Sequence, residues 1–234
     1  MRFALTCLLF WFLLWPVWAA DTAEIEVALV AIGNGSAEEI KTRLCTDRLM
    51  TFNEEAHAEA IAALPDALRR QRLTDGKLLR RVEPILQRAM QTQGRTRASQ
   101  QPELFLFTHE LPTAQTWRGA VLLVSSSLVE ALYDGELAGV LAHELSHAYF
   151  EDEMAVAQRE HDTRAMRIVE LKCDGVAIVS VQLLGYNPTS YLSGLQRLQQ
   201  MTKRLGRSSS VLPSHPDLVV RAQFSARLLK ALSA

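Results

Sequence analysis

Apolar residues recur three and four positions apart over most of the chain, and this spacing places them along one face of a helix. With caps and Gly or Pro breaks, the pattern predicts helices over Ser36 to about Thr51, Glu54 to Ala63, Lys77 to Gln91, Asp134 to about Phe150, Met154 to Leu184, Thr189 to Arg204 and Leu218 to Leu232. Ser36 and Glu39 fit a capping box, and Asp134 suits an N-cap. Pro84 predicts a kink in the third helix. The run AEIEVALVAI, residues 23–32, fits either a strand or a helix.

Two short apolar runs have the length of strands: ELFLFT, from Glu103 to Thr108, and AVLLVSSS, from Ala120 to Ser127. The segment HELPTAQTWRG separates them, and we expect a small antiparallel sheet with Ala120 to Ser126 as its free edge. One small sheet among many helices predicts a mostly helical α+β fold. Because no internal repeat is present, residues 20–234 are predicted to form a single domain.

The N-terminus has the organisation of a secretory signal over residues 1–19. Arg2 precedes an apolar run from Ala4 to Trp15, and Val17-Trp18-Ala19 suits a cleavage site. An uncleaved anchor is the alternative, although the run is shorter than the roughly 20 residues of a membrane span. Since no second long apolar run follows, we expect an exported mature chain without a stable membrane span, either periplasmic or secreted.

Two cysteines, Cys45 and Cys173, remain after removal of a signal that contains Cys7. An exported protein can join them in a disulfide, and two buried thiols are the alternative.

The composition is that of an ordinary globular protein, with 48% hydrophobic residues, 22% charged residues and a formal net charge of -1. This balance gives no reason to expect a nucleic-acid partner. Residues 69–97 are locally basic, and we interpret them as the solvated face of helices.

The candidate chemistry lies in AHELSHA, residues 142–148. His143 and His147 are four residues apart, so on a helix both imidazoles can reach one zinc ion, and Glu144 lies close enough to act on water held there. A coincidental pair of histidines is the alternative. A second His-Glu-Leu run begins at His109, but Pro112 blocks a helix and Thr113 stands where the second His would be.

A catalytic zinc needs a third protein ligand. Phe150 and Glu153 stand where a metzincin would have Gly and His, which excludes that class. The remaining candidates are His161 and Glu170. Glu170 is favoured because Asp174 follows on the same helix face, where it could accept a hydrogen bond from a ligand imidazole.

Four motifs then follow in order: GELAGVLAHELSH, ELKCD, GYNP with YLSGLQRL, and SHPDLVVRAQ. With them the chain resembles peptidase family M48, gluzincin-type zinc peptidases that include HtpX-like and CAAX-protease-like enzymes and exported bacterial proteins. The resemblance runs from about Lys77 to the C-terminus. It implies a zincin-like domain holding one zinc ion through His143, His147 and Glu170, with Glu144 as general base and Asp174 supporting a ligand.

The chain also departs from that family. AQTWRGAVLLVSSSL replaces a Gly-Gly-rich stretch, so the substrate groove is expected to be unusual, and Lys-Cys replaces the commoner Glu-Ala before Asp174. His215 could contact the metal site or steady an oxyanion, and it could equally cap the last helix or order its loop. Arg221 could pair with substrate, although a salt bridge to a buried acid is favoured. His57 and His161 are expected at the surface.

These observations predict a zinc-dependent endopeptidase that hydrolyses peptide bonds of misfolded or envelope proteins with a zinc-bound water activated by Glu144. Its expected partners are polypeptide substrates and proteins of the envelope. One alternative is a zinc-containing envelope chaperone or binding factor with little or no proteolysis, although a pure binder does not need Glu144. Another is a metal-free helical interaction protein.

Overall fold

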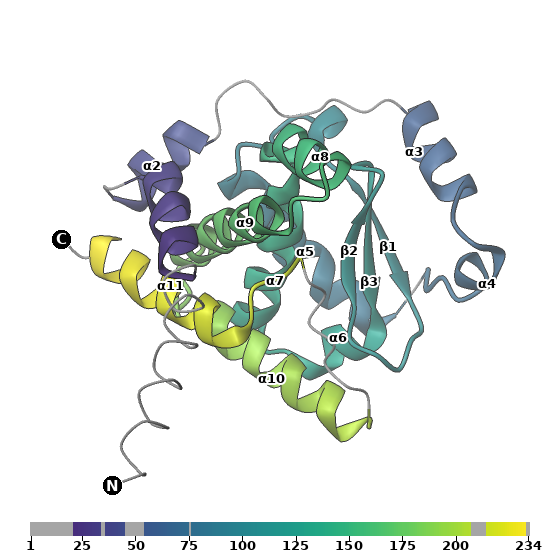
Figure 1. The fold of residues 1–234 in the computed structure, drawn as a ribbon. Coiled ribbons are helices and arrows are strands. Elements are labelled where there is room, and N and C mark those ends of the chain that lie inside the picture. The colour runs from purple at the N-terminus through teal and green to yellow at the C-terminus, as the bar shows by residue number, and fades with distance from the viewer. Residues whose placement is uncertain (1–20, 34–35, 45–53, 75, 207–213, 233–234) are drawn as a thin grey trace, which may run out of the picture.

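A computed structural model of the chain describes residues 21–33, 36–44, 54–74, 76–206 and 214–232 (Figure 1). After a helix over residues 21–32, the elements are α2 (Ala37–Leu44), α3 (Glu54–Ala62), α4 (Asp66–Arg69), α5 (Lys77–Thr92), β1 (Glu103–Phe107), β2 (Ala114–Trp117), β3 (Val121–Ser125), α6 (Ser126–Ala131), α7 (Asp134–Ser146), α8 (Glu151–Arg159), α9 (Thr163–Leu183), α10 (Ser190–Arg204) and α11 (Leu218–Leu232). Short 3-10 turns span Ala98–Gln100 and His147–Tyr149. The mostly helical α+β class is confirmed.

The sheet has the order β1-β3-β2. β1 and β3 are parallel, so the expected antiparallel sheet is wrong for this pair, and only β2 runs antiparallel to β3. The cause is the extra strand within the predicted loop, which turns back at Arg118 and Gly119, both with positive φ. β3 is therefore the central strand rather than the free edge, and β2 forms the edge nearest α7 (Figure 1).

Side chains of β3 alternate between two apolar clusters, as a pleated strand requires. Leu122 and Val124 belong to the main core, with α5, α7 and α9. Val121 and Leu123 belong to a smaller cluster beneath α3. Trp117 joins this smaller cluster and donates a hydrogen bond from Nε1 to the carbonyl of Ala60, at 3.0 Å.

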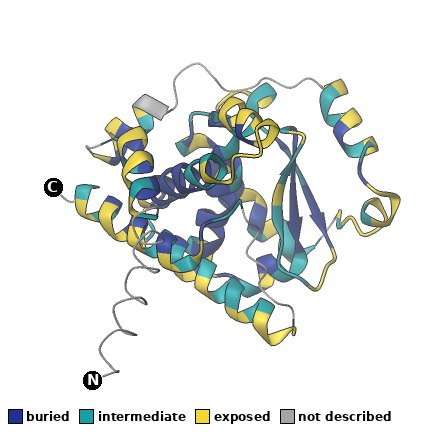
Figure 2. Cartoon of the chain, in the orientation of Figure 1, coloured by how far each residue is buried: buried dark blue, intermediate teal, exposed yellow. Residues whose placement is uncertain are grey.

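α9 runs through the centre of the fold and is buried from Val169 to Val181 (Figure 2). It packs against α7, α8, α11, α2 and the helix over residues 21–32, whose Ile32 touches the position of Gly175. A helix enclosed on all sides carries its polar side chains into the interior. Glu170 and Asp174 are therefore interior groups rather than solvated acids.

The predicted capping box is confirmed, since Ser36 and Glu39 exchange capping hydrogen bonds. Residues 23–32, which the sequence left open between strand and helix, are helical. Pro84 lies within α5, and the kink expected there stays a prediction. The predicted extension from Leu44 to Thr51 lies outside the described residues, as do Cys45 and the expected signal.

Other helix boundaries differ from prediction. The single helix expected from Met154 to Leu184 is two helices, because His161 adopts a φ of 56° and Asp162 caps α9 by accepting a hydrogen bond from the N–H of Ala165. Asp134 is the first residue of α7 rather than its N-cap, since Glu136 accepts a hydrogen bond from the N–H of Tyr133. Within the described ranges, no helix is both long and apolar enough to span a bilayer.

Candidate metal centre and active site

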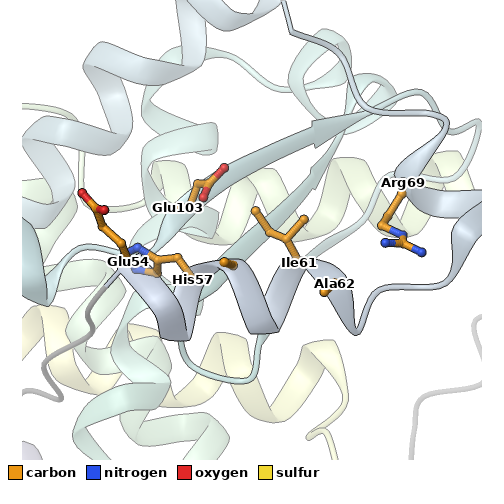
Figure 3. Close-up of a pocket in the computed structure, with 7 residues that line it drawn as sticks. Glu54, His57, Ile61, Ala62, Arg69 and Glu103 are labelled. Atoms are coloured by element: carbon orange, nitrogen blue, oxygen red, sulfur yellow. The ribbon is translucent and has the colours of Figure 1, made fainter.

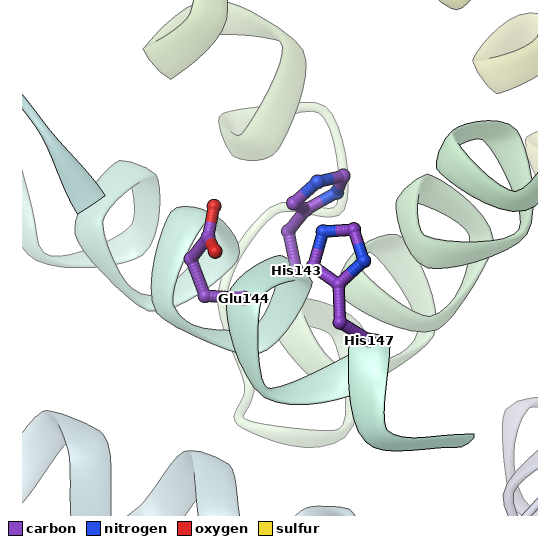
Figure 4. Close-up of side chains that lie close together, drawn as sticks. All are labelled: His143, Glu144 and His147. Carbon is purple, nitrogen blue, oxygen red and sulfur yellow. The ribbon is translucent and has the colours of Figure 1, made fainter. Parts of the chain in front are cut away.

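α7 carries His143 and Glu144, and His147 follows directly as its C-cap and the first residue of the 3-10 turn, rather than lying inside a helix that continues to Phe150. Leu137, Leu141 and Leu145 bury the opposite side of this helix and fix its rotation. The ligand atoms of the three polar residues lie within 4.8 Å of one another (Figure 4). The two imidazoles meet edge to face with ring centroids 5.1 Å apart. Helical spacing therefore produces the convergence that the sequence predicted.

Glu170 on α9 faces both imidazoles. Its Oε2 lies 3.3 Å from Nε2 of His143, and its Oε1 lies 3.8 Å from Nε2 of His147. Burial alone would raise the pKa of Glu170, but the three nearby imidazoles, with His143 foremost, lower this pKa to about 2. Oε2 is buried and makes no hydrogen bond within the described structure. An enclosed carboxylate oxygen without a hydrogen bond, beside two imidazole nitrogens, fits a site for a cation such as zinc.

The two imidazoles differ in charge when no metal is present. Burial would lower the pKa of His143, but the adjacent carboxylates of Asp174 and Glu170 raise it to about 9. Burial and the positive charge on His143 lower the pKa of His147 to about 4. One imidazole thus carries a proton between two carboxylates, and a bound cation would take the place of this proton.

Asp174 lies one turn beyond Glu170 and is fully buried. Its Oδ1 is 3.0 Å from Nδ1 of His143, and its Oδ2 accepts a hydrogen bond from Nε of Arg221 at 2.8 Å. Nη2 of Arg221 also donates to Oδ1. Burial would raise the pKa of Asp174, but the Arg221 guanidinium and the contact with His143 hold it below its usual range. The expected salt bridge of Arg221 with a buried acid is confirmed.

Cys173 contacts the other imidazole. Its Sγ lies 3.6 Å from Nδ1 of His147, so Cys173 touches the candidate metal centre. The thiol is free, fully buried, and has a pKa raised well above its usual value by burial. The possible disulfide partner, Cys45, lies outside the described residues.

Glu144 borders the cleft beside the imidazoles and is held by the edge strand β2. The N–H of Thr116 donates to Oε2 of Glu144 at 3.2 Å, and Oγ1 of Thr116 donates to the Glu144 carbonyl at 2.8 Å. Burial raises the pKa of Glu144 to about 7, despite the opposing charge of His143. A carboxylate that titrates near neutrality can both accept and return a proton.

The cleft passes over this cluster. Ala114 and Thr116 line it along β2, Arg118 lines it from the turn after that strand, and Met154 and Gln158 line it from α8. Its floor contains the side chains of Glu144, His147 and Glu170. An extended chain lying in the cleft would therefore follow the edge strand past the candidate base.

His215 belongs to the same cleft. Its Nε2 lies 3.5 Å from Oε2 of Glu170, and its Nδ1 lies 3.0 Å from Oγ of Ser214. Burial lowers the pKa of His215. The first turn of α11 is capped by Asp217, which accepts a hydrogen bond from the N–H of Val220. His215 therefore lies beside the Glu170 carboxylate and does not cap the last helix, while its contact with Ser214 also fits the loop-ordering role that the sequence left open.

The other histidines lie elsewhere. His109 follows β1 in an exposed loop, where its Nδ1 accepts a hydrogen bond from the N–H of Leu111. His161 is exposed between α8 and α9 and does not line the cleft. His57 is half-buried in a hollow between α3 and β1, beside Ile61 and Glu103 (Figure 3). That hollow lies at the face of the sheet covered by α3, away from α7.

Sequence reasoning missed two residues of the site, Thr116 and Tyr191. Thr116 lies in a short strand with little apolar character, and no spacing connects it to Glu144. Tyr191 donates a hydrogen bond from its hydroxyl to Oδ1 of Asp174 at 2.6 Å, and this hydroxyl is 2.8 Å from Nδ1 of His143. The one available signal was the tyrosine in YLSGLQRL, directly after GYNP.

A sequence model described as Peptidase family M48 matches residues 77–163, from the start of α5 to the start of α9. The matched part contains the sheet, His143, Glu144 and His147, and it ends before Glu170, Asp174 and His215. No curated protein matches the chain. The match over the sheet and the HExxH helix agrees with the geometry of the cluster, and together they support an M48 family metallopeptidase.

Proposed function

We propose that the protein is a zinc-dependent endopeptidase, with one zinc ion per chain. The observation that carries the proposal is the convergence of Nε2 of His143 and Nε2 of His147 on the Glu170 carboxylate, at 3.3 and 3.8 Å. Two imidazoles and one carboxylate form a common protein ligand set of catalytic zinc. His143, His147 and Glu170 would hold the metal.

Each neighbouring residue has a task in peptide hydrolysis. When bound, zinc supplies a Lewis acid that polarises the scissile carbonyl and acidifies water. Glu144 would take the proton of the attacking water and return it to the leaving nitrogen. Thr116 would hold the Glu144 carboxylate in place, as its N–H does in the structure. His215, which lines the same cleft and lies 3.5 Å from Oε2 of Glu170, would donate a hydrogen bond to the developing oxyanion.

The substrate would be an extended polypeptide that adds to β2, the edge strand that borders the cleft. The carbonyl of Thr113 accepts a hydrogen bond from the N–H of Ser125, so alternate residues from Thr113 onward pair with β3. Ala114 therefore turns its peptide groups to the open edge, as Thr116 does with its carbonyl, whereas the N–H of Thr116 is held by Glu144. Pairing through the backbone places few demands on substrate sequence, which suits the degradation of unfolded chains.

The place of action is also a proposal. The charged start, apolar run and small residues of residues 1–19 support export to the periplasm or the medium. An exported peptidase of this kind would meet misfolded envelope proteins as substrates and other envelope proteins as partners.

Zinc content and cleavage together test the proposal. Purified protein from residue 20 onward should contain about one zinc per chain, and Glu170→Ala should lose it. His161→Ala is the matched control, because it removes the rejected ligand candidate and should keep zinc. Unfolded casein should be cleaved by the wild type, while Glu144→Gln should keep zinc and lose cleavage.

The outcomes separate the alternatives. Zinc bound without turnover of any unfolded protein would favour the chaperone or binding factor. Absence of zinc under metal-replete conditions would contradict the proposal and favour the metal-free interaction protein. Retention of zinc by Glu170→Ala with loss from His161→Ala would move the third ligand to His161.

A further inference from the structure

Tyr191 places a hydroxyl among the charged groups behind His143. Only 1% of its surface is exposed, and its ring stacks on the His143 imidazole with centroids 5.8 Å apart and planes 20° apart. The hydroxyl lies 2.6 Å from Oδ1 of Asp174, 2.8 Å from Nδ1 of His143 and 2.5 Å from Nη2 of Arg221. A buried hydroxyl with three polar partners has no spare capacity for a hydrogen bond.

The approach of α10 to α7 brings this hydroxyl into reach. Gly139 on α7 faces the tyrosine, and a Cβ at that position would lie 2.9 Å from Cβ and Cδ2 of Tyr191. Gly194, one turn later on α10, faces Glu136 of α7 in the same way. The two glycines let α7 and α10 approach closely, and a larger residue at either position would push the helices apart.

The protons in this group can be assigned from the chemistry of its members. Arg221 can only donate, and the Asp174 carboxylate, paired with that guanidinium, can only accept. The single proton of Tyr191 therefore goes to Oδ1 of Asp174, and its lone pairs face Arg221 and His143. Nδ1 of His143 then faces two acceptors, the tyrosine oxygen and Oδ1 of Asp174, the latter at 3.0 Å. It must carry a hydrogen, which makes Nε2 the nitrogen that turns toward Glu170.

We propose that Tyr191 is a positioning residue of the metal centre: its hydroxyl and ring hold His143 as the Nδ1–H tautomer and orient Nε2 for the metal. This inference rests on the proposed function, because it assumes that His143 binds a metal ion. Asp174 alone would orient the His143 ring less firmly, because its Oδ1 is shared with Arg221. This oxygen also lies farther from Nδ1 of His143 than the tyrosine oxygen does.

Tyr191→Phe tests the role, because it keeps the ring and its stacking and removes only the hydroxyl. Zinc affinity is measured by competition with a chromophoric chelator, and the cobalt-substituted protein gives the visible spectrum of the metal site. We expect zinc to bind about tenfold more weakly than in the wild type, the scale on which outer partners of metal-bound histidines act, with a changed cobalt spectrum. Tyr186→Phe is the matched control, because Tyr186 lies just before α10 and outside the site, and it should change neither quantity.

The results separate this inference from the proposed function. If the wild type binds zinc and Tyr191→Phe loses stability but changes zinc affinity less than about twofold, with an unchanged cobalt spectrum, the hydroxyl is only structural and the inference fails. If the wild type itself binds no zinc, the proposed function fails first. If Tyr191→Phe does not fold, the inference is tested on the wild-type zinc protein by proton NMR. The spectra should show an exchange-protected Tyr191 hydroxyl proton beside a proton on Nδ1 of His143. A His143 proton on Nε2 would overturn the inference.

Discussion

Arg221→Met should destabilise the protein far more than Arg227→Met, a change of the same kind on the same helix. Arg221 and Asp174 form a buried pair, with side-chain exposures of 12% and 0%. Arg227 and Glu26 form a surface pair, with exposures of 43% and 52%. Methionine keeps most of the apolar length of arginine, so the comparison isolates the lost charge and hydrogen bonds.

The expected loss of unfolding free energy depends on which partners Asp174 keeps in the variant. Removing one partner of a buried ion pair costs about 3–5 kcal/mol, because the other charge stays buried and uncompensated. In the metal-free protein the His143 imidazolium and the Tyr191 hydroxyl still face Asp174, so we expect the lower limit, about 3 kcal/mol. The exposed pair of Arg227 should contribute at most about 1 kcal/mol.

The pH dependence gives an independent check with a definite sign. The pKa of Asp174 is lowered by folding, so its contribution is present above its unfolded value and is lost as the pH falls through the folded value. Without Arg221 that pKa should rise, and the carboxyl should take up a proton in mildly acidic solution. The cost of Arg221→Met should therefore be largest near neutral pH and smaller toward about pH 4.

Urea unfolding of the metal-free protein from residue 20 onward measures these differences. Trp117 is the single tryptophan in that part of the chain, so its fluorescence reports unfolding from the smaller apolar cluster beneath α3. Stabilities of the two variants within about 1 kcal/mol of each other at neutral pH would refute the reasoning, as would a cost of Arg221→Met that does not change with pH.

Three further predictions concern the cleft. Because burial raises the pKa of Glu144 from 4.5 to about 7, its contribution to stability is present below pH 4.5 and lost as the pH rises to 7. Glu144→Gln should therefore stabilise the metal-free protein at alkaline pH by up to about 3 kcal/mol and change it little in acid; equal unfolding free energies throughout would contradict this. Thr116→Val removes the hydroxyl bond to the Glu144 carbonyl and should lower kcat several-fold with zinc content unchanged, whereas an unaltered kcat would deny Thr116 a role in placing the base. In a Cys45→Ser background the buried thiol of Cys173 should react with a thiol reagent only after denaturant is added, and rapid labelling of the folded protein would show that the site opens.

The sequence alone determined what depends on local spacing. A helix places residues four apart on one face whatever surrounds it, so His143 and His147 could be brought together from their positions alone, with Glu144 beside them. Apolar periodicity located most helices because burying one face is the main source of helix stability in a folded protein. Pro112 separated the run at His109 from the true helix for an equally local reason.

Tertiary structure decided what depends on distant contacts. The direction of β1 relative to β3 depended on β2, whose residues carry little apolar signal, and the break before α9 depended on a left-handed conformation at His161 that its neighbours do not demand. Glu170 and His161 were both possible third ligands of the metal. The packing of α9 into the interior brings Glu170 to the two imidazoles, whereas His161 lies in solvent. Tyr191 reaches His143 only because Gly139 lets two helices approach closely. Spacing along a chain fixes which side chains share a face, but only the packing of whole elements fixes which faces meet.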